Sequence, residues 1–301
     1  MARIEGLAAM SLVRMQADAV VAQLEAFATV VDARSESEYA LDHLPGAVNW
    51  PTLDDVEREA IGTLYIQVSA FEAKKRGAAV AARNISRHIE THVLDQPKDW
   101  NPLVYCWRGG KRSGSLALVL DQIGFRVTLI EGGYKAFRAA MLRDLETRVA
   151  QLQFQVVCGT TGSGKTRLLH ALQRAGAQVL DLEDLACHRS SVLGAIPGIA
   201  QPSQKRFDTQ VWNAIRHFDP ERPVYVESES KKVGNVSVAE ALVSRMRDSP
   251  CLELRLSMEE RVALLMEDYD AFVQDREHFC ERLDALTQAR GKAVIQRWKD
   301  T

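Results

Sequence analysis

The sequence has few cysteines, no long apolar run and no marked excess of either charge. Its 301 residues include five cysteines, which are widely spaced and form no CxxC pair, so we expect neither disulfides nor a structural zinc site. Charged residues interrupt every apolar stretch well before the roughly 18 residues that a membrane span needs. The first thirty residues also lack the uninterrupted apolar core of a secretory signal. We therefore expect a cytoplasmic protein without a membrane segment.

The composition is that of a folded globular protein, with 46% hydrophobic and 26% charged residues. The formal net charge of -2 excludes a grossly basic nucleic-acid-binding protein. It leaves room for a local basic surface, because nucleic acid responds to the local charge. The length favours two domains over one.

Short β-branched or apolar runs alternate with segments of helical periodicity along the chain. The predicted strands lie within residues 29–34, 43–51, 102–106, 126–134, 154–158, 177–184 and 222–228. Strands that alternate with helices indicate parallel sheets, so we predict an α/β fold. The expected domains are residues 1–140, with an insert of two helices at about 54–95, and residues 141–301, with a C-terminal helical segment from about 256. A helix over 135–150 connects them.

A cysteine stands where an apolar strand meets a glycine-rich, cationic loop. Residues 105 to 114 read YCWRGGKRSG, so Cys106 ends a predicted strand and a helix begins just after the loop. In α/β sheets, ligands gather at the carboxyl ends of the strands. The two glycines let N–H groups turn inward at the helix start, which binds anions and stabilises a thiolate. We predict that Cys106 is reactive and faces an oxyanion, with positive charge from Arg108, Lys111 and Arg112.

A second glycine loop reads GTTGSGKT and satisfies G-x-x-x-x-G-K-[ST] between a strand and a helix. Its N–H groups can cradle a diphosphate, Lys165 can neutralise the charge and Thr166 can hold a Mg²⁺. The run VYVES offers Glu227 as an acidic metal ligand or, equally well, as the solvated end of a core strand. We expect no tightly bound cofactor. The predicted diphosphate-binding residues are Gly159, Thr160, Thr161, Gly162, Ser163, Gly164, Lys165 and Thr166.

The second half of the helical insert is rich in cations. Such a run is either a solvated helix face or a surface for RNA phosphates. The RNA-binding candidates are Lys74, Lys75, Arg76, Arg83 and Arg87.

The first half of the chain resembles a rhodanese domain in DARSESEY, HLPGAVNWP, YCWRGGKRSG and LIEGGYKAFR. The resemblance implies a rhodanese-like parallel sheet with Cys106 as the chalcogen-carrying residue. Cys106 to Arg112 also fit C-x5-R, the pattern of the phosphatase relatives of rhodaneses. A thiolate facing an anion site can attack phosphorus as well as sulfur or selenium. The alternatives are a rhodanese-type sulfurtransferase or a cysteine phosphatase, each with a P-loop nucleotide-binding domain.

The order of the units resembles that of the tRNA 2-selenouridine synthases, in which a rhodanese domain precedes a P-loop NTPase-like domain. Matching stretches include VEREAIGTLY, GTTGSGKT, DLEDLACHRSSVLG, QPSQKRF and VESESKKVG. The resemblance implies a transferase that converts wobble 2-thiouridine in tRNA to 2-selenouridine. It also implies an S-geranyl-2-thiouridine intermediate, with geranyl diphosphate and selenophosphate as co-substrates. A different class of interpretation is an RNA-binding scaffold with a vestigial P-loop.

The family motifs also imply roles for individual residues. Cys106 becomes the selenium carrier, in a loop shaped by Arg108, Gly109, Gly110, Lys111, Arg112 and Ser113. Gly77 matches a glycine of the family's insert and is either a candidate for the geranyl-transfer step or a helix-ending turn. The expected substrate contacts are Asp181, Glu183, His188, Arg189 and Ser191. An aromatic platform for the wobble base has three candidates, Trp50, Trp107 and Trp212.

Overall fold

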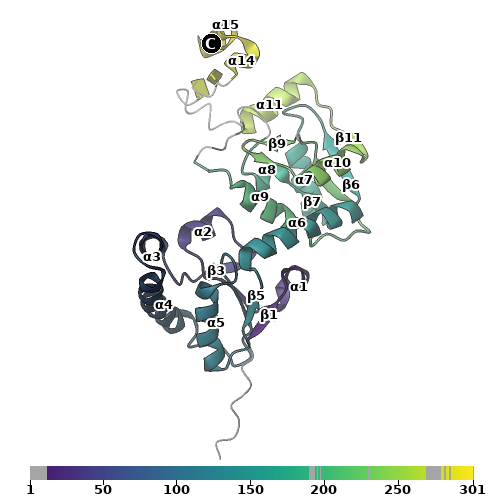
Figure 1. The fold of residues 1–301 in the computed structure, drawn as a ribbon. Coiled ribbons are helices and arrows are strands. Elements are labelled where there is room, and N and C mark those ends of the chain that lie inside the picture. The colour runs from purple at the N-terminus through teal and green to yellow at the C-terminus, as the bar shows by residue number, and fades with distance from the viewer. Residues whose placement is uncertain are drawn as a thin grey trace, which may run out of the picture. The chain divides into compact units, whose positions relative to one another are not determined.

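The structure is a computed structural model, and it describes residues 12–189, 194, 196, 198–229, 231–268, 279–280, 283–284 and 286–300. The chain divides into two compact units, Met1–Asp144 and Leu145–Thr301. Figure 1 labels the elements of both units. The prediction of an α/β fold with parallel sheets and a helical C-terminal segment is confirmed.

The sheet of the first unit is parallel throughout, in the strand order β1-β5-β4-β2-β3. Its strands are β1 (Val13–Met15), β2 (Thr29–Asp32), β3 (Ala47–Asn49), β4 (Pro102–Tyr105) and β5 (Thr128–Ile130). The central strand β4 is buried along its whole length, as expected for a parallel sheet with both faces covered. Its carboxyl end carries Cys106 to the edge of the sheet where the loops gather.

Helices cover this sheet and form the predicted insert. They are α1 (Ala17–Ala22), the 3-10 turn η1 (Leu24–Ala26), α2 (Glu36–Leu41), α3 (Asp55–Gln67), α4 (Ala70–His92), α5 (Lys111–Ile123) and α6 (Gly133–Gln151). Ile85 of α4 and Leu116 of α5 join Val104 of the sheet in one buried cluster. The two helices of the insert and the helix over 135–150 are confirmed.

The insert is a pair of closely packed helices, α3 and α4, which lie side by side in Figure 1. Gly77 lies inside α4, where an added Cβ would stand 3.3 Å from Cγ2 of Ile61 on α3. The helix continues from Gly77 to His92. The interpretation of Gly77 as a helix-ending turn is therefore wrong, and the missing side chain instead lets the two helices approach.

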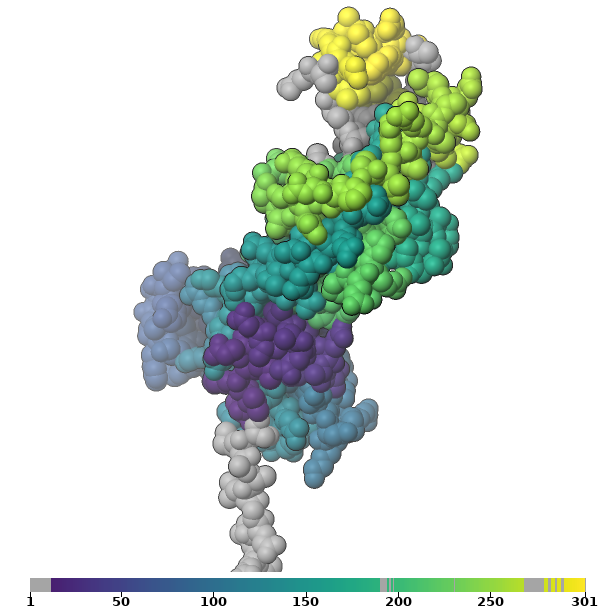
Figure 2. Space-filling model, turned by 90° about the vertical axis from the view of Figure 1, so that its right-hand side faces the viewer, coloured from purple at the N-terminus to yellow at the C-terminus, as the bar shows by residue number. Residues whose placement is uncertain are grey.

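The second unit contains a second parallel sheet, in the order β11-β6-β8-β7, and a two-stranded antiparallel pair. The strands are β6 (Phe154–Cys158), β7 (Gln178–Leu180), β8 (Val224–Glu227), β9 (Lys232–Val233), β10 (Val236–Ser237) and β11 (Cys251–Glu253). The helices are α7 (Lys165–Arg174), α8 (Leu182–Leu185), α9 (Gln204–Ile215), α10 (Glu240–Arg247), α11 (Met258–Asp268), α14 (Thr287–Arg290) and α15 (Lys292–Asp300). In Figure 2 the yellow-green segment that includes α11 lies at the surface of this unit. No helix in the described ranges is long and apolar enough to cross a membrane.

Two sheet-edge strands, β1 and β11, were not predicted. Each is only three residues long and is partly or fully exposed. Such a strand carries too few residues for a period-two pattern. What creates it is pairing with a partner that is distant in the sequence: β1 pairs with β5, and β11 with β6.

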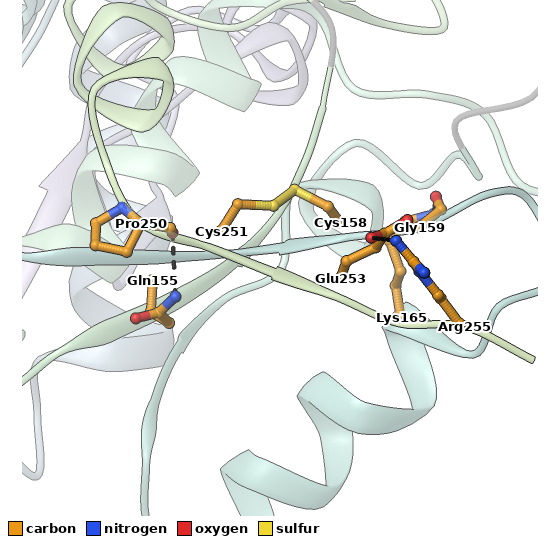
Figure 3. Close-up of a disulfide and its surroundings, with 8 residues drawn as sticks. All are labelled: Gln155, Cys158, Gly159, Lys165, Pro250, Cys251, Glu253 and Arg255. Carbon is orange, nitrogen blue, oxygen red and sulfur yellow. Dashed lines mark hydrogen bonds and ion pairs between the residues drawn. A yellow bond between two sulfur atoms is a disulfide. The ribbon is translucent and has the colours of Figure 1, made fainter.

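The expectation that the chain has no disulfide is wrong. Cys158 and Cys251 are bonded, with their Cα atoms 6.2 Å apart and a sequence separation of 93. The bond joins the neighbouring strands β6 and β11 directly before Gly159 (Figure 3). The pair could not be predicted from the sequence, because the two cysteines are far apart along the chain and only the sheet brings their strands together. Cys106, Cys187 and Cys280 are free.

A buried charged network lies below the loops of the first unit. The guanidinium of Arg34, 1% exposed, donates to Oδ2 of Asp32 at 2.6 Å and to the carbonyl oxygen of Asp42 at 2.6 Å. Asp32 also accepts from the hydroxyl of Tyr105 at 2.7 Å, and Asp42 from that of Tyr134 at 2.6 Å. The network ties the loop after β2 to the strand that carries Cys106.

Replacing Arg34 should destabilise the first unit strongly. In Arg34→Met the carboxylate of Asp32 stays buried without its counter-charge, which typically costs about 3–5 kcal/mol. Lys75→Met removes an ion pair with Glu72 whose lysine is 54% exposed, and such pairs contribute about 0–1 kcal/mol. Urea denaturation of both variants measures the difference. If both variants lose the same free energy of unfolding, the stabilising role of the buried network is contradicted.

Candidate functional site

Cys106 lies at the floor of the loop between β4 and α5. The residue is 3% exposed and belongs to the buried cluster under α5, whereas Arg108, Gly110 and Lys111 of the loop are exposed. The N–H of Gly110 donates to Sγ of Cys106 at 3.3 Å, and the hydroxyl of the fully buried Ser113 donates at 3.1 Å. Both donors sit at the positive end of α5, so they stabilise negative charge on the sulfur.

A second loop, which follows β5, holds the cysteine loop in shape. The backbone N–H of Tyr134 donates to the carbonyl of Cys106 at 2.8 Å. Gly109 has φ +64°, and an added Cβ would stand 2.7 Å from the carbonyl oxygen of Ile130. Gly133 has φ +61°, and its Cβ would collide with Cys106 and Gly109. Gly133 was not predicted to belong to this site. The only signal for its role was the double glycine at the end of a predicted strand.

The cations of the loop differ in their surroundings. Arg108 and Lys111 are exposed. Arg112 is half-buried, and its two terminal nitrogens contact both carboxylate oxygens of Glu38 on α2, one of them at 3.3 Å. Burial would raise the pKa of Glu38, but the hydrogen bonds and charge of Arg112 outweigh it and hold that pKa below its usual value. Glu38 was not predicted as part of this site.

Of the three tryptophans considered as a platform for a base, one is accessible. Trp50 is 5% exposed and Trp212 is fully buried. Trp107 follows Cys106, is half-buried and stacks on Tyr134 with the ring centroids 5.4 Å apart. Trp107 is the most exposed of the three.

Ser113→Ala should slow the reaction of Cys106 with iodoacetamide at neutral pH. The variant loses one of two donors that stabilise negative charge on the sulfur, an effect of about 1.5–3 kcal/mol. A less stabilised thiolate is intrinsically more nucleophilic, so only part of this appears in the rate, and we expect a fall of about three- to tenfold. Ser115→Ala is the matched control, since that hydroxyl donates to the carbonyl of Lys111 and not to sulfur. Mass spectrometry of Cys106 alkylation follows both rates. An unchanged rate in Ser113→Ala would rule out this role.

The second glycine loop connects β6 to α7. Gly159, Gly162 and Gly164 have φ of +152°, +78° and +83°. At Gly159 an added Cβ would stand 2.9 Å from the carbonyl oxygen of Leu254, so only glycine fits there. Nζ of Lys165 donates to the carbonyl of Gly159 at 2.9 Å (Figure 3). The amine thus already lies across the loop, where a diphosphate oxygen could replace that carbonyl.

Acidic residues gather beside this loop. Glu227 ends β8, is 2% exposed and accepts from the N–H of Glu183 at 2.8 Å. Its other oxygen, Oε2, has no hydrogen-bond partner among the described residues. Burial, and then the nearby charge of Asp181, raise the pKa of Glu227 well above its usual value. The interpretation of Glu227 as a solvated strand end is therefore wrong.

The predicted substrate-contact residues are only partly brought together. Asp181 caps α8 and lies 3.1 Å from His170, and Glu183 accepts from the hydroxyl of Thr166 at 3.3 Å. His188 and Arg189 follow α8, and Arg189 donates its N–H to the carbonyl of Gly194 at 2.8 Å. Ser191 lies outside the described residues. Asp181 and Glu183 therefore border the phosphate loop.

The acidic cluster fits a Mg²⁺ bound together with phosphate oxygens. No three histidine, cysteine, aspartate or glutamate side chains of the described residues form a metal-binding group by themselves. Mg²⁺ usually takes one or two carboxylates or hydroxyls from the protein and the remaining oxygens from substrate phosphates and water. Thr166 and the unpartnered oxygen of Glu227 are donors of that kind.

Ionisation of Glu227 should make the chain less stable as the pH rises. A glutamate in the unfolded chain releases its proton near pH ~4.3, whereas the folded state holds it to higher pH. The free energy of unfolding therefore falls from about that pH upward. Glu227→Gln keeps an acceptor for the N–H of Glu183 but cannot ionise. Its free energy of unfolding, measured by urea titration, should fall less between pH 5 and pH 7 than that of the unmutated protein. The control is Glu253→Gln, which removes an exposed carboxylate. A hydrogen bond from Arg255 lowers the pKa of Glu253, so the free energy of unfolding of this variant should fall with pH as that of the unmutated protein does. If the free energy of unfolding of Glu227→Gln falls with pH as steeply as that of the unmutated protein, the raised pKa of Glu227 is contradicted.

The basic residues of the insert are all exposed on α4. Arg76, Arg83 and Arg87 are spaced by seven and four residues, so they lie on one face of the helix. Arg83 also donates to Glu57 at 2.7 Å, and Lys75 pairs with Glu72 at 2.6 Å. One stripe of guanidinium groups therefore faces solvent, with Lys74 and Lys75 on other sides of the helix.

The fold and these two loops define a rhodanese-like unit followed by a phosphate-loop unit, and comparison with known proteins agrees. A family model described as a rhodanese-like domain matches residues 16–140, and one described as the AAA domain of tRNA 2-selenouridine synthase matches residues 152–293. The tRNA 2-selenouridine synthase of Sulfurovum sp. is 32% identical over 251 residues, which cover 82% of this chain and 67% of that protein. The chain belongs to the tRNA 2-selenouridine synthase family.

Further similar proteins add detail. The tRNA 2-selenouridine synthase of Marinobacter nauticus is 34% identical over 247 residues, which cover 80% of this chain and 65% of that protein. The chain thus spans slightly less than two thirds of this relative. Among solved structures, the N-terminal domain of a putative ATP/GTP binding protein from Clostridium difficile is 31% identical, with a TM-score of 0.37, over 44% of this chain and 99% of that one.

Proposed function

We propose that the chain is a tRNA-modifying transferase that replaces the sulfur of a wobble 2-thiouridine by selenium. The observation that carries this proposal is the sulfur of Cys106, which accepts two hydrogen bonds at the start of a helix. A P-loop in the same chain supplies a second anion site. Family membership supports tRNA as the substrate.

The P-loop serves the first half-reaction, in which geranyl diphosphate alkylates the thiouridine. The thiocarbonyl sulfur attacks C1 of the geranyl group, so a C–S bond forms and the C–O bond to diphosphate breaks. The leaving diphosphate carries the negative charge, which Lys165 and the N–H groups of the glycine loop stabilise. When Mg²⁺ is bound, Thr166 and Glu227 would hold it and it would neutralise further charge.

The Cys106 loop serves the second half-reaction. Selenophosphate is a small tetrahedral anion, which suits inward N–H groups with a nucleophilic sulfur below them. The Cys106 thiolate attacks phosphorus, so an S–P bond forms, the P–Se bond breaks and selenide leaves; water then hydrolyses the S–P bond, which releases phosphate and restores the thiolate. Selenium at the selenide level then attacks C2 of the base, where a C–Se bond forms, the C–S bond breaks and geranyl thiolate leaves. Alkylation has turned a poor leaving group into a good one.

tRNA would bind along α4. Its exposed arginine stripe suits a phosphate backbone, which attracts cations without reading sequence. Trp107 lies beside Cys106 and could stack on the unstacked wobble base. Gly77 contributes by letting α3 pack against this helix, so its role in geranyl transfer would be indirect.

Mass spectrometry of digested tRNA tests this proposal. With thiouridine-containing tRNA, geranyl diphosphate and selenophosphate, the parent should form selenouridine. Cys106→Ser should stop at geranylated thiouridine, and Lys165→Ala should lose at least about tenfold in geranylation because a charge-assisted contact is gone.

Cys187→Ser is the matched control, since Cys187 is also a free cysteine, and it should behave as the parent. Selenium incorporation by Cys106→Ser would refute the role of that residue. Binding of tRNA by the parent without either product would instead favour an RNA-binding scaffold, and hydrolysis of an aryl phosphate a cysteine phosphatase.

A further inference from the structure

The ion pair between Glu38 and Arg112 bears directly on how the Cys106 loop binds anions. Arg112 is the last residue of the C-x5-R stretch and directly precedes Ser113, which donates to the sulfur. An arginine in this position can clamp two oxygens of a tetrahedral anion with its planar fork of N–H donors. In this chain the fork is already occupied by both carboxylate oxygens of Glu38.

Glu38 is held in place to make this contact. It is the third residue of α2, and its side chain accepts from the N–H of Ser35 at 3.3 Å, which completes a capping box at the start of the helix. The side chains of Glu38 and Arg112 are 18% and 22% exposed. A paired charge at this depth is screened less by solvent and salt than a surface pair. The second guanidinium nearby, that of Arg58, is 3.9 Å away and 46% exposed, so it is a weaker partner.

We propose that Glu38 is a positioning residue that occupies the fork of Arg112 and so prevents the Cys106 loop from clamping ordinary phosphates. The loop then binds its anion through backbone N–H groups and the exposed Arg108 and Lys111. An anion that offers only phosphate oxygens must compete with a carboxylate that is already in place. Glu38 thereby keeps the loop from holding inorganic phosphate tightly.

This inference deepens the proposed function but can be tested without it. Inorganic phosphate is the probe, and its effect is the protection of Cys106 from iodoacetamide, followed by mass spectrometry. Neither tRNA, selenium nor a prenyl donor takes part. The protection experiment can therefore fail while selenouridine still forms, and it can succeed where selenouridine does not form.

Glu38→Gln is the main variant. Glutamine at this position also completes a capping box, so α2 should keep its N-terminus while the charge that holds Arg112 is lost. We expect phosphate to protect Cys106 at concentrations at least about tenfold lower than in the parent, because a bidentate charged contact becomes available. Glu38→Asp keeps the charge but is one methylene shorter, and it should show a smaller gain in the same direction.

The chain offers a closely matched control in Glu57. This residue is also the third of its helix, completes a capping box with Asp54, has an 18% exposed side chain and pairs with an arginine, Arg83. Glu57→Gln removes the same charge from an equivalent position on α3 and should leave the phosphate concentration for half protection unchanged. Circular dichroism shows whether each variant is folded.

A double-mutant cycle with Arg112→Ala distinguishes the fork from a general charge effect. In the Arg112→Ala background, Glu38→Gln should no longer improve protection by phosphate, since no fork remains to be released. The inference is overturned if Glu38→Gln protects no better than Glu57→Gln. It is equally overturned if the improvement persists without Arg112, because removal of a negative charge would then explain the whole effect.

Discussion

The structure of the Cys106 loop depends on the close approach of two backbone segments. The loop after β4 and the loop after β5 touch at Gly109 and Gly133, both with positive φ, and a side chain at Gly133 would collide with Cys106 and Gly109. This contact lets the N–H of Tyr134 reach the carbonyl of Cys106. The sulfur is thereby placed under the first turn of α5, where Gly110 and Ser113 donate to it.

The Cys106 loop and the P-loop have the same construction, each in its own unit. Each lies at the carboxyl end of a central parallel strand, opens a helix and needs glycines with positive φ. In each, a cation of the loop contacts an oxygen of the protein: Arg112 contacts Glu38, and Lys165 contacts the carbonyl of Gly159. The two contacts differ in strength. A half-buried carboxylate is a stronger partner for a cation than a neutral carbonyl.

Much of the fold was predictable because its signals are local. The strands at 102–106 and 154–158, the glycine loops and the two helices of the insert were all predicted from short stretches, and the structure contains them. The prediction that Cys106 is reactive has the same local basis, since strand, cysteine, glycines and cations are neighbours in the sequence. The three-residue strands β1 and β11 were not predicted, because such strands form only through a distant partner.

The sequence by itself determined two α/β units, the position of Cys106 at a strand end and the P-loop at residues 159–166, because each of these follows from neighbours along the chain. Only the tertiary structure decided which distant side chains meet at those places. Glu38 reaches Arg112 and Cys158 joins Cys251 at sequence separations of 74 and 93, and Glu227 accepts from the N–H of Glu183 in α8 at a separation of 44. The physical reason is that a parallel sheet aligns strand ends whose order in space differs from their order in the sequence.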